Sequence, residues 1–149
     1  MTINWITVVV FVVGAVLYAV YGVGDLWRGL AMRRLARTFG FAYLRQRLPE
    51  ALSLYGTPFA QRRFTWNVME GEHHGLRVVV FDCQVGEEKQ GWRRSVIAIR
   101  TGPVTMSAAK VDPRMKVDSS GGWSVFYYPQ EMKEGLMRVP QLRVCLSSL

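Results

Sequence analysis

The sequence predicts an α+β protein with one N-terminal transmembrane helix, followed by a small antiparallel β-sheet domain with flanking helices. Residues Trp5 to Gly24 contain no charged side chain, and all 19 Lys and Arg residues follow Asp25. From Phe64 onward, short apolar and β-branched runs alternate with turns rich in Gly, Pro or charge. Without the span, the 149-residue chain is still long enough for one modest core. The predicted divisions are a transmembrane anchor at 1–25, a basic juxtamembrane helix at 26–40 and a soluble α+β domain at 41–149.

The uncharged N-terminal run has the length of a membrane span. At ~1.5 Å per residue it extends ~30 Å, the thickness of the hydrocarbon core of a bilayer. Its Val-rich composition would favour a strand in water, but in lipid every backbone polar group must be satisfied internally, so a helix is expected. Trp5 stands at one end, with Tyr21 and Trp27 near the other, as is typical of interfacial aromatic residues.

Two alternatives compete with an uncleaved anchor. A core helix or strand of a soluble domain is also apolar, but 20 uncharged N-terminal residues exceed what such an element needs. A cleaved signal peptide requires a basic first region and a small-residue cleavage site. Nothing before Trp5 is basic except the terminal amine, and the run is followed by Asp25-Leu26-Trp27-Arg28. The sequence therefore favours an anchor that is retained.

Basic residues lie on one side of the span only. The membrane-surface candidates are Arg28, Arg33, Arg34 and Arg37. The positive-inside rule then predicts a single-pass protein of the bacterial inner membrane, with its N-terminus outside and its domain in the cytoplasm. Anionic head groups attract such residues by ~1 kcal/mol each, so anionic lipid is an expected partner.

The net charge of +8 is concentrated beside the span. Residues 26–63 carry a net charge of +7, whereas residues 64–149 carry only +2. Topology and lipid contact explain this distribution, so nucleic acid is not an expected partner. The two cysteines, Cys83 and Cys145, are expected to stay reduced in a cytoplasmic domain and to behave as buried apolar residues.

Residues 26–40 have the pattern of a helix. Leu26, Leu30, Leu35 and Phe39 recur every four or five positions, and Gly40 is a suitable terminator. Two interpretations remain open. The segment is either an amphipathic helix lying on anionic lipid, or a continuation of the anchor whose apolar side packs on the domain.

The remaining elements are predicted from period and turn residues. Residues 64–101 are expected to form three antiparallel strands, with turns near Gly71–Gly75 and Gly86–Gly91 and with Val68 opposite Val78. The connections are short, so an antiparallel meander is expected. The predicted strands are 41–44, 64–69, 76–83, 92–101, 106–111, 115–118 and 123–128. A helical turn at 50–54 and short helices at 131–136 and 140–149 complete the prediction.

A set of spaced residues resembles a family signature. Gly40-Phe41, Asn67-Val68 with Gly71, Gly75, and Phe81-Asp82 are similar to the "GF…RNVxxG…G…VxVFDY" signature of an uncharacterised bacterial membrane-protein family with N-terminal transmembrane spans. The resemblance covers roughly residues 36–101 and departs at Cys83, where an aromatic residue is usual. It implies an architecture and carries no activity. It also implies that Asn67 starts or pairs the hairpin, and that Gly71 and Gly75 permit its turn.

One polar cluster has the residue types of a metal or catalytic site. It comprises Glu70, Glu72, His73, His74 and Asp82, with Cys83 beside them. Adjacent histidines on an extended segment are expected to point to opposite sides, and the usual ligand spacings are missing. Cys83 lies in an apolar strand that should bury an inert thiol. A solvated polar loop is therefore the favoured interpretation, and no catalytic, cofactor-binding or metal residue is assigned.

Two further patterns in the sequence, its glycine pairs and one aromatic run, partly match nucleotide- or RNA-binding motifs. The glycines of Gly121-Gly122 and Gly22-x-Gly24 lack the Gly-Lys-[Ser/Thr] that follows in a phosphate-binding loop. The aromatic run Trp123, Phe126, Tyr127 and Tyr128 has the composition of an RNA-stacking sheet, but both faces of the sheet need apolar residues, so core packing is favoured.

Small residues in the span predict a helix partner. Gly14, Ala15 and Ala19 have the spacing with which helices approach closely in membranes. The leading hypothesis is a membrane-anchored, non-enzymatic interaction protein, an accessory subunit or scaffold of a larger membrane complex. The alternative is a membrane-tethered enzyme or metal-dependent sensor using the Glu72/His73/His74/Asp82 region.

Overall fold

A computed structural model describes residues 4–86, 91–132 and 135–149 of the chain. The chain divides into two compact units, Met1–Ala31 and Met32–Leu149. Most of the predicted charged hairpin loop at 85–91 lies outside the described residues.

Helix α1, Trp5–Phe39, begins in the first unit. Among the described residues it is the one helix long and apolar enough to cross a membrane, and none of its most apolar stretch is buried. Trp5 is 79% exposed and Tyr18 is 84% exposed. The core helix of a soluble protein would be mostly buried, so this first part of α1 is not the core of the domain. Its Val-rich residues form a helix as predicted, with the backbone polar groups paired within the segment.

The last turns of α1 belong to the second unit. Met32, Leu35 and Ala36 are buried there, at the spacing that places side chains on one side of a helix. The helix runs unbroken through residues 25 and 26, and its apolar side packs on the domain, which is the second of the two interpretations above. Gly40, with φ +72°, ends the helix as predicted, and Phe41 N donates to Ala36 O at 2.8 Å.

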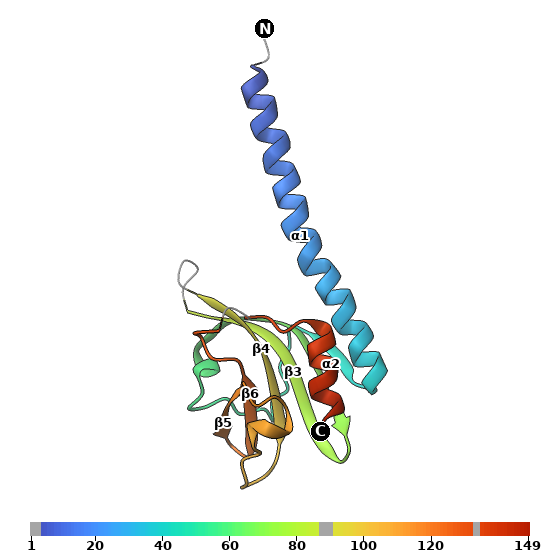
Figure 1. The fold of residues 1–149 in the computed structure, drawn as a ribbon, viewed down its shortest axis with the longest axis vertical. Coiled ribbons are helices and arrows are strands. Elements are labelled where there is room, and N and C mark those ends of the chain that lie inside the picture. Colours follow the sequence, from blue (N-terminus) through green and yellow to red (C-terminus); the bar gives the residue numbers. More distant parts are fainter. Residues whose placement is uncertain (1–3, 87–90, 133–134) are drawn as a thin grey trace. The chain divides into compact units, whose positions relative to one another are not determined.

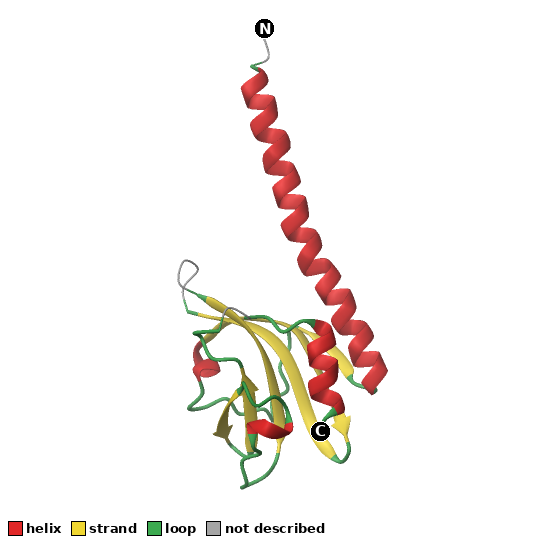
Figure 2. Cartoon of the chain, viewed as in Figure 1, coloured by secondary structure: helices red, strands yellow, loops and turns green. Residues whose placement is uncertain are grey.

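The domain contains a six-stranded, wholly antiparallel sheet (Figures 1 and 2). This confirms the predicted α+β class with an antiparallel sheet. The strand order is β1-β2-β3-β4-β6-β5. The strands are β1 Ala42–Arg45, β2 Arg62–His73, β3 Leu76–Val85, β4 Trp92–Arg100, β5 Lys116–Ser120 and β6 Trp123–Tyr127.

The first hairpin is tighter than predicted. Strand β2 continues to His73, so the turn predicted near Gly71–Gly75 is confined to His74-Gly75. His74 and Gly75 both have positive φ, which a two-residue hairpin turn requires. The shorter turn sets a different register, in which Val78 lies opposite Gly71 rather than Val68. The three predicted antiparallel strands within 64–101 are otherwise confirmed.

The second half of the sheet departs from a simple meander. Strand β6 lies between β4 and β5. After β4 the chain therefore forms the edge strand β5 first, and then returns as β6 to fill the position next to β4. The strand predicted at 106–111 is wrong, because Ser107 caps a short 3-10 helix at Ala108–Lys110. A second 3-10 helix occurs at Pro58–Gln61. The helical turn predicted at 50–54 is wrong, because residues 50 and 51 form a turn and 52–54 are irregular.

Helix α2, Val139–Ser147, confirms the predicted C-terminal helix. The described residues of 131–136 are not helical, contrary to prediction. Helix α2 and the end of α1 contribute to one core, on the face of the sheet that carries Val78, Val80, Ile97 and Ile99. The long connection between β1 and β2 covers the other face through Leu54 and Phe59. Both faces of the sheet are therefore buried.

Candidate functional site

The four predicted membrane-surface arginines are divided between the two units. Arg28 lies in the first unit, whereas Arg33, Arg34 and Arg37 lie in the second. The Arg33 guanidinium sits 5.6 Å from the centre of the Tyr43 ring, which fixes it against the domain. Arg34 and Arg37 are exposed.

The predicted helix-packing residues are exposed on α1. Gly14 and Ala15, with Val10, Phe11 and Tyr18, line a shallow apolar groove on the helix. A Cβ atom added at Gly14 would meet no described atom within 4 Å. Ala19 is also exposed but does not line the groove. The groove is therefore open along the face that carries the two small residues.

The residues of the signature converge in the domain. Phe41 lies so close to Gly71 that a Cβ atom there would stand 2.1 Å from Phe41 Cδ1. Gly71 is thus required by the close approach of Phe41, rather than by the turn that the resemblance implied. Asn67 adopts a left-handed backbone with φ +52°, at a β-bulge between Trp66 and Met69. Asn is among the few non-glycine residues that tolerate this conformation.

Asn67 and Asp82 form the centre of a buried polar network. Asp82 is fully buried and accepts hydrogen bonds from Asn67 Nδ2 at 2.8 Å and from Ser95 Oγ at 2.7 Å. The Tyr43 hydroxyl donates to Asn67 Oδ1 at 2.8 Å, and Met137 N donates to Ser95 Oγ at 2.9 Å. Burial raises the pKa of Tyr43 above its ordinary value, so this hydroxyl keeps its proton.

This network connects four strands and the segment before α2. Each buried polar group in it has a partner, which is the condition under which such groups are tolerated in a core. The Asp82 carboxylate therefore has a structural role, because its hydrogen bonds link β1 to β4 through Tyr43, Asn67 and Ser95. The sequence singled out Asn67 and Asp82 but could not show that they bond to each other.

The two histidines stack upon each other, contrary to the expectation that they point to opposite sides. Their ring centres are 4.1 Å apart, because His74 turns the backbone into the left-handed region. Phe39 packs edge-on against His73 at 5.2 Å. His73 Nε2 is buried without a hydrogen-bond partner among the described residues.

The histidines do not meet Asp82 or Cys83. His73 is opposite Leu76 at one end of β3, and Asp82 lies six residues further along that strand. At ~3.3 Å per residue the two are about 20 Å apart. Glu70 is paired instead with Arg77, whose Nε donates to it at 2.7 Å. The cluster weighed from the sequence is therefore not one site.

Both cysteines are buried thiols. Burial, reinforced by the charge of Asp82, raises the pKa of Cys83 to about 12. Burial, with the charge of Asp112, raises the pKa of Cys145 to about 11. The thiolate is the nucleophile, so neither cysteine has the character of a reactive one.

The aromatic run is part of the core. Trp123, Phe126, Tyr127 and Tyr128 are all buried, so they do not form an exposed stacking surface. Trp123 Nε1 donates to Ala51 O at 2.9 Å, and the Tyr128 hydroxyl donates to Asp112 Oδ2 at 2.6 Å. Burial and the hydrogen bond to Asp112 raise the pKa of Tyr128. The core-packing interpretation is confirmed.

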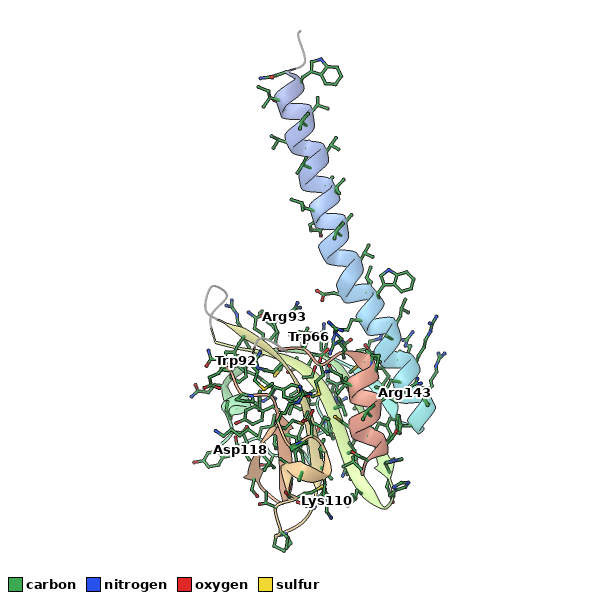
Figure 3. All side chains as sticks on the ribbon, viewed as in Figure 1. Trp66, Trp92, Arg93, Lys110, Asp118 and Arg143 are labelled. Carbon is green, nitrogen blue, oxygen red and sulfur yellow. The ribbon has the colours of Figure 1, made fainter. Side chains whose placement is uncertain are left out.

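One end of the sheet gathers arginines and tryptophans that are distant in sequence. It is the end where β2 begins, β3 ends and β4 begins. Trp66, Trp92 and Arg93 lie there, and Lys110 lies at the opposite end (Figure 3). The Arg93 guanidinium is 4.7 Å from the centre of the Trp66 ring, and that of Arg94 is 4.7 Å from the Trp92 ring. This group is not apparent from the sequence, because the net charge of residues 64–149 is small and only the strand pairing brings these residues together.

Comparison of the chain with family models, with curated proteins and with solved structures found no match. The resemblance to bacterial membrane proteins therefore stays a prediction.

Proposed function

We propose that the chain is a single-pass membrane protein whose domain is a non-enzymatic interaction module, an accessory subunit or scaffold of a larger membrane complex. The observation that carries this proposal is the contrast between the two units. The first exposes an uninterrupted apolar helix surface that water does not tolerate, and the second is closed around two cores. The bilayer and a partner helix are the environments that such a helix fits.

A partner helix is supported by the groove at Gly14 and Ala15. Small residues let helix backbones approach closely, and van der Waals packing then drives association in lipid. The groove is flanked by Phe11 and Tyr18, which offer side walls to a second helix. We expect the partner to be another membrane protein.

The orientation follows from the arginines. Arg28, Arg33, Arg34 and Arg37 lie on one side of the uncharged run. The proposal places them at the anionic cytoplasmic leaflet of a bacterial inner membrane, with the N-terminus outside and the domain in the cytoplasm. Buried thiols of high pKa suit a reducing compartment and need no disulfide.

The enzyme or sensor alternative receives no support from a specific contact. Its histidines and its Asp82 lie at different places along β3, and Asp82 is occupied by Asn67 and Ser95. These contacts favour the interaction proposal over the enzyme or sensor alternative.

The partner is tested by mild-detergent purification of the tagged full chain, followed by mass spectrometry of what co-purifies. The variant Gly14→Leu/Ala15→Leu fills the groove and is expected to lose a partner that the wild-type chain retains. The matched control is Val12→Leu/Val16→Leu, on the opposite side of the helix, which should keep it. Equal recovery with both variants would reject the groove as the contact.

Retention and orientation of the anchor are tested separately. The intact mass of membrane-extracted protein should include Trp5, and a mature chain beginning near Asp25 would contradict an uncleaved anchor. A cysteine at the exposed position Ser119, introduced by Ser119→Cys, reports the side of the membrane. A membrane-impermeant thiol reagent should label it only after lysis, and labelling of intact cells with a permeable outer membrane would show the opposite orientation.

A further inference from the structure

We propose that the arginine- and tryptophan-bearing end of the sheet binds the phosphate of an anionic lipid head group, in a pocket beside the start of β4. This inference rests on the proposed membrane anchorage and adds a second lipid contact, within the domain itself. It assigns a ligand class to residues distinct from the arginines next to the span.

The pocket is open and has a volume of about 680 Å³. The pairing of β6 with β4 is confined to Ile97–Arg100 of β4, so the first half of β4 is flanked by the segment that leads to α2. There Ser95 N donates to Gly135 O at 3.2 Å. The lining residues are Trp92, Arg93, Arg94, Gly135, Leu136, Arg138 and Gln141.

Arg94 gives the pocket a buried positive charge. It is only 5% exposed, and its donors reach carbonyl oxygens rather than a carboxylate. Nε donates to Tyr128 O, while Nη2 donates to Pro129 O, Gln130 O and Met132 O. Among the described residues no acidic side chain forms an ion pair with Arg94, although Glu131 acts on it from a distance. Burial lowers the pKa of Arg94, which remains a cation at any physiological pH.

Among the described residues, one N–H donor of Arg94 has no partner and is available to a ligand. Nη1 carries two hydrogens, and within the described part of the chain it donates only to Arg93 O, at 2.9 Å. Gly135 lies against this nitrogen, because a Cβ atom at 135 would stand 2.6 Å from it. The same Cβ atom would stand 2.4 Å from Arg93 O, so glycine at 135 is what lets the backbone of this segment pack closely against Arg93 and Arg94.

Two further arginines line the same pocket. Arg93 and Arg138 are exposed, and both line it. Three of the seven lining residues are thus arginines, the residue type whose N–H donors bind phosphate oxygens in pairs. A phosphate ester is therefore the chemical class that this pocket fits.

The position of the pocket points to lipid rather than to a soluble phosphate. Within the domain, Phe39 contacts His73 at the hairpin end of the sheet, and Arg33 lies at Tyr43, whose hydroxyl reaches Asn67. The last turns of α1 thus run from the level of Asn67 to that of His73. Within the second unit, the last turns of α1 therefore begin nearer to the end of the sheet that bears Arg93 than to the hairpin end. Trp66 and Trp92 at that end are residues that membrane interfaces favour.

The test is a thermal titration of the full chain in a neutral detergent. Dioctanoyl phosphatidic acid is the probe, and dioctanoyl phosphatidylcholine and inorganic phosphate are the comparison ligands. A ligand that binds only the folded state raises the melting midpoint in a concentration-dependent manner, which yields its dissociation constant. We expect phosphatidic acid to raise the midpoint more than either comparison ligand does at equal concentration.

The variant Arg93→Gln/Arg138→Gln should weaken phosphatidic acid binding by roughly 30-fold, since each basic residue contributes ~1 kcal/mol near anionic lipid. The matched control Arg100→Gln/Lys110→Gln removes the same charge from the opposite end of the sheet and should change affinity little. Both variants alter exposed side chains, and their lipid-free melting midpoints check that they fold. If the first variant melts early, the single variant Arg138→Gln replaces it, with an expected loss of roughly fivefold.

Three outcomes would overturn the proposal. The first is equal affinity in the pocket variant and its control. The second is a loss confined to Arg34→Gln/Arg37→Gln, which would place lipid at the juxtamembrane arginines alone. The third is an equal midpoint shift with inorganic phosphate, which would identify a soluble ligand. None of these outcomes bears on retention of the anchor or on co-purification of a partner, so failure here is distinct from failure of the proposed function.

Discussion

The two parts of helix α1 meet different surroundings. Before Met32 the helix exposes apolar side chains on all sides, for example Tyr18, which is 84% exposed. From Met32 to Phe39 the same helix buries Met32, Leu35 and Ala36 and exposes Arg34 and Arg37. An apolar stripe with a polar opposite side belongs to a protein core, whereas a helix that is apolar all around belongs in lipid. The comparison predicts that substitutions in the two parts act on different equilibria.

The largest effect is expected from charge in the first part. Val13→Asp/Val16→Asp places two carboxylates near the middle of the predicted span, at ~3 kcal/mol each on insertion scales. We expect much of the protein to become extractable from membranes by alkaline carbonate, while the unfolding of the domain is unchanged. A variant that remains wholly in the membrane pellet would break the comparison, because the segment would then not need to insert.

A smaller effect is expected from Leu35→Ala, and it should act on the unfolding of the domain rather than on membrane insertion. Leu35 is fully buried, and truncation of such a residue typically costs about 3 kcal/mol through lost burial and a residual cavity. Urea unfolding of the detergent-solubilised chain, followed by near-ultraviolet circular dichroism, should show the loss. Leu17→Ala, in the exposed part of the same helix, is the matched control and should leave domain unfolding unchanged. Equal effects of the two substitutions would contradict the division at Met32.

The contact between Phe41 and Gly71 sharpens the comparison at the end of the helix. Gly71→Ala places a methyl group where the Phe41 ring now lies, and such overpacking costs about 2 kcal/mol. The same unfolding measurement applies. Gly75→Ala is a useful contrast, because its cost comes from a positive φ of +78° rather than from a clash. Adding Phe41→Leu to Gly71→Ala should restore part of the lost unfolding free energy, because it removes the clash. Adding Phe41→Leu to Gly75→Ala should restore none.

The smallest effect is expected from acid. The hydrogen bond from Arg114, with a second from Tyr128, lowers the pKa of Asp112 to about 2, against ~3.9 in an unfolded chain. The stabilisation is therefore complete above about pH 4 and is lost as the pH falls through 2. It should be on the order of 1 kcal/mol, because Arg114 is half-exposed and solvent screens the pair. Asp112→Asn should remove this part of the pH dependence between pH 4 and 2, and an unchanged slope would contradict the assignment.

Several elements were predictable from the sequence because they depend on local features. Alternation along the chain predicted the strands at Leu76–Val85 and Trp92–Arg100. The backbone freedom of glycine predicted the turn at Gly75 and the helix end at Gly40. The predicted pairing of Val68 with Val78 was wrong. It depended on the length of one turn and on a bulge at Asn67, and a change of one residue in either shifts the whole register. The stacking of His73 on His74 was missed for the same local reason, a left-handed residue in the turn.

By itself the sequence determined an uncharged apolar run of membrane length and the side on which its arginines lie, since both are properties of consecutive residues. It also determined an antiparallel sheet with two apolar faces. Only the tertiary structure decided that Asn67 and Asp82 bond to each other, and that β6 lies between β4 and β5. It alone brought Arg93, Arg94 and Arg138 to one pocket. Such contacts join residues far apart in the chain, and strand order and register, which local patterns do not encode, determine which of them meet.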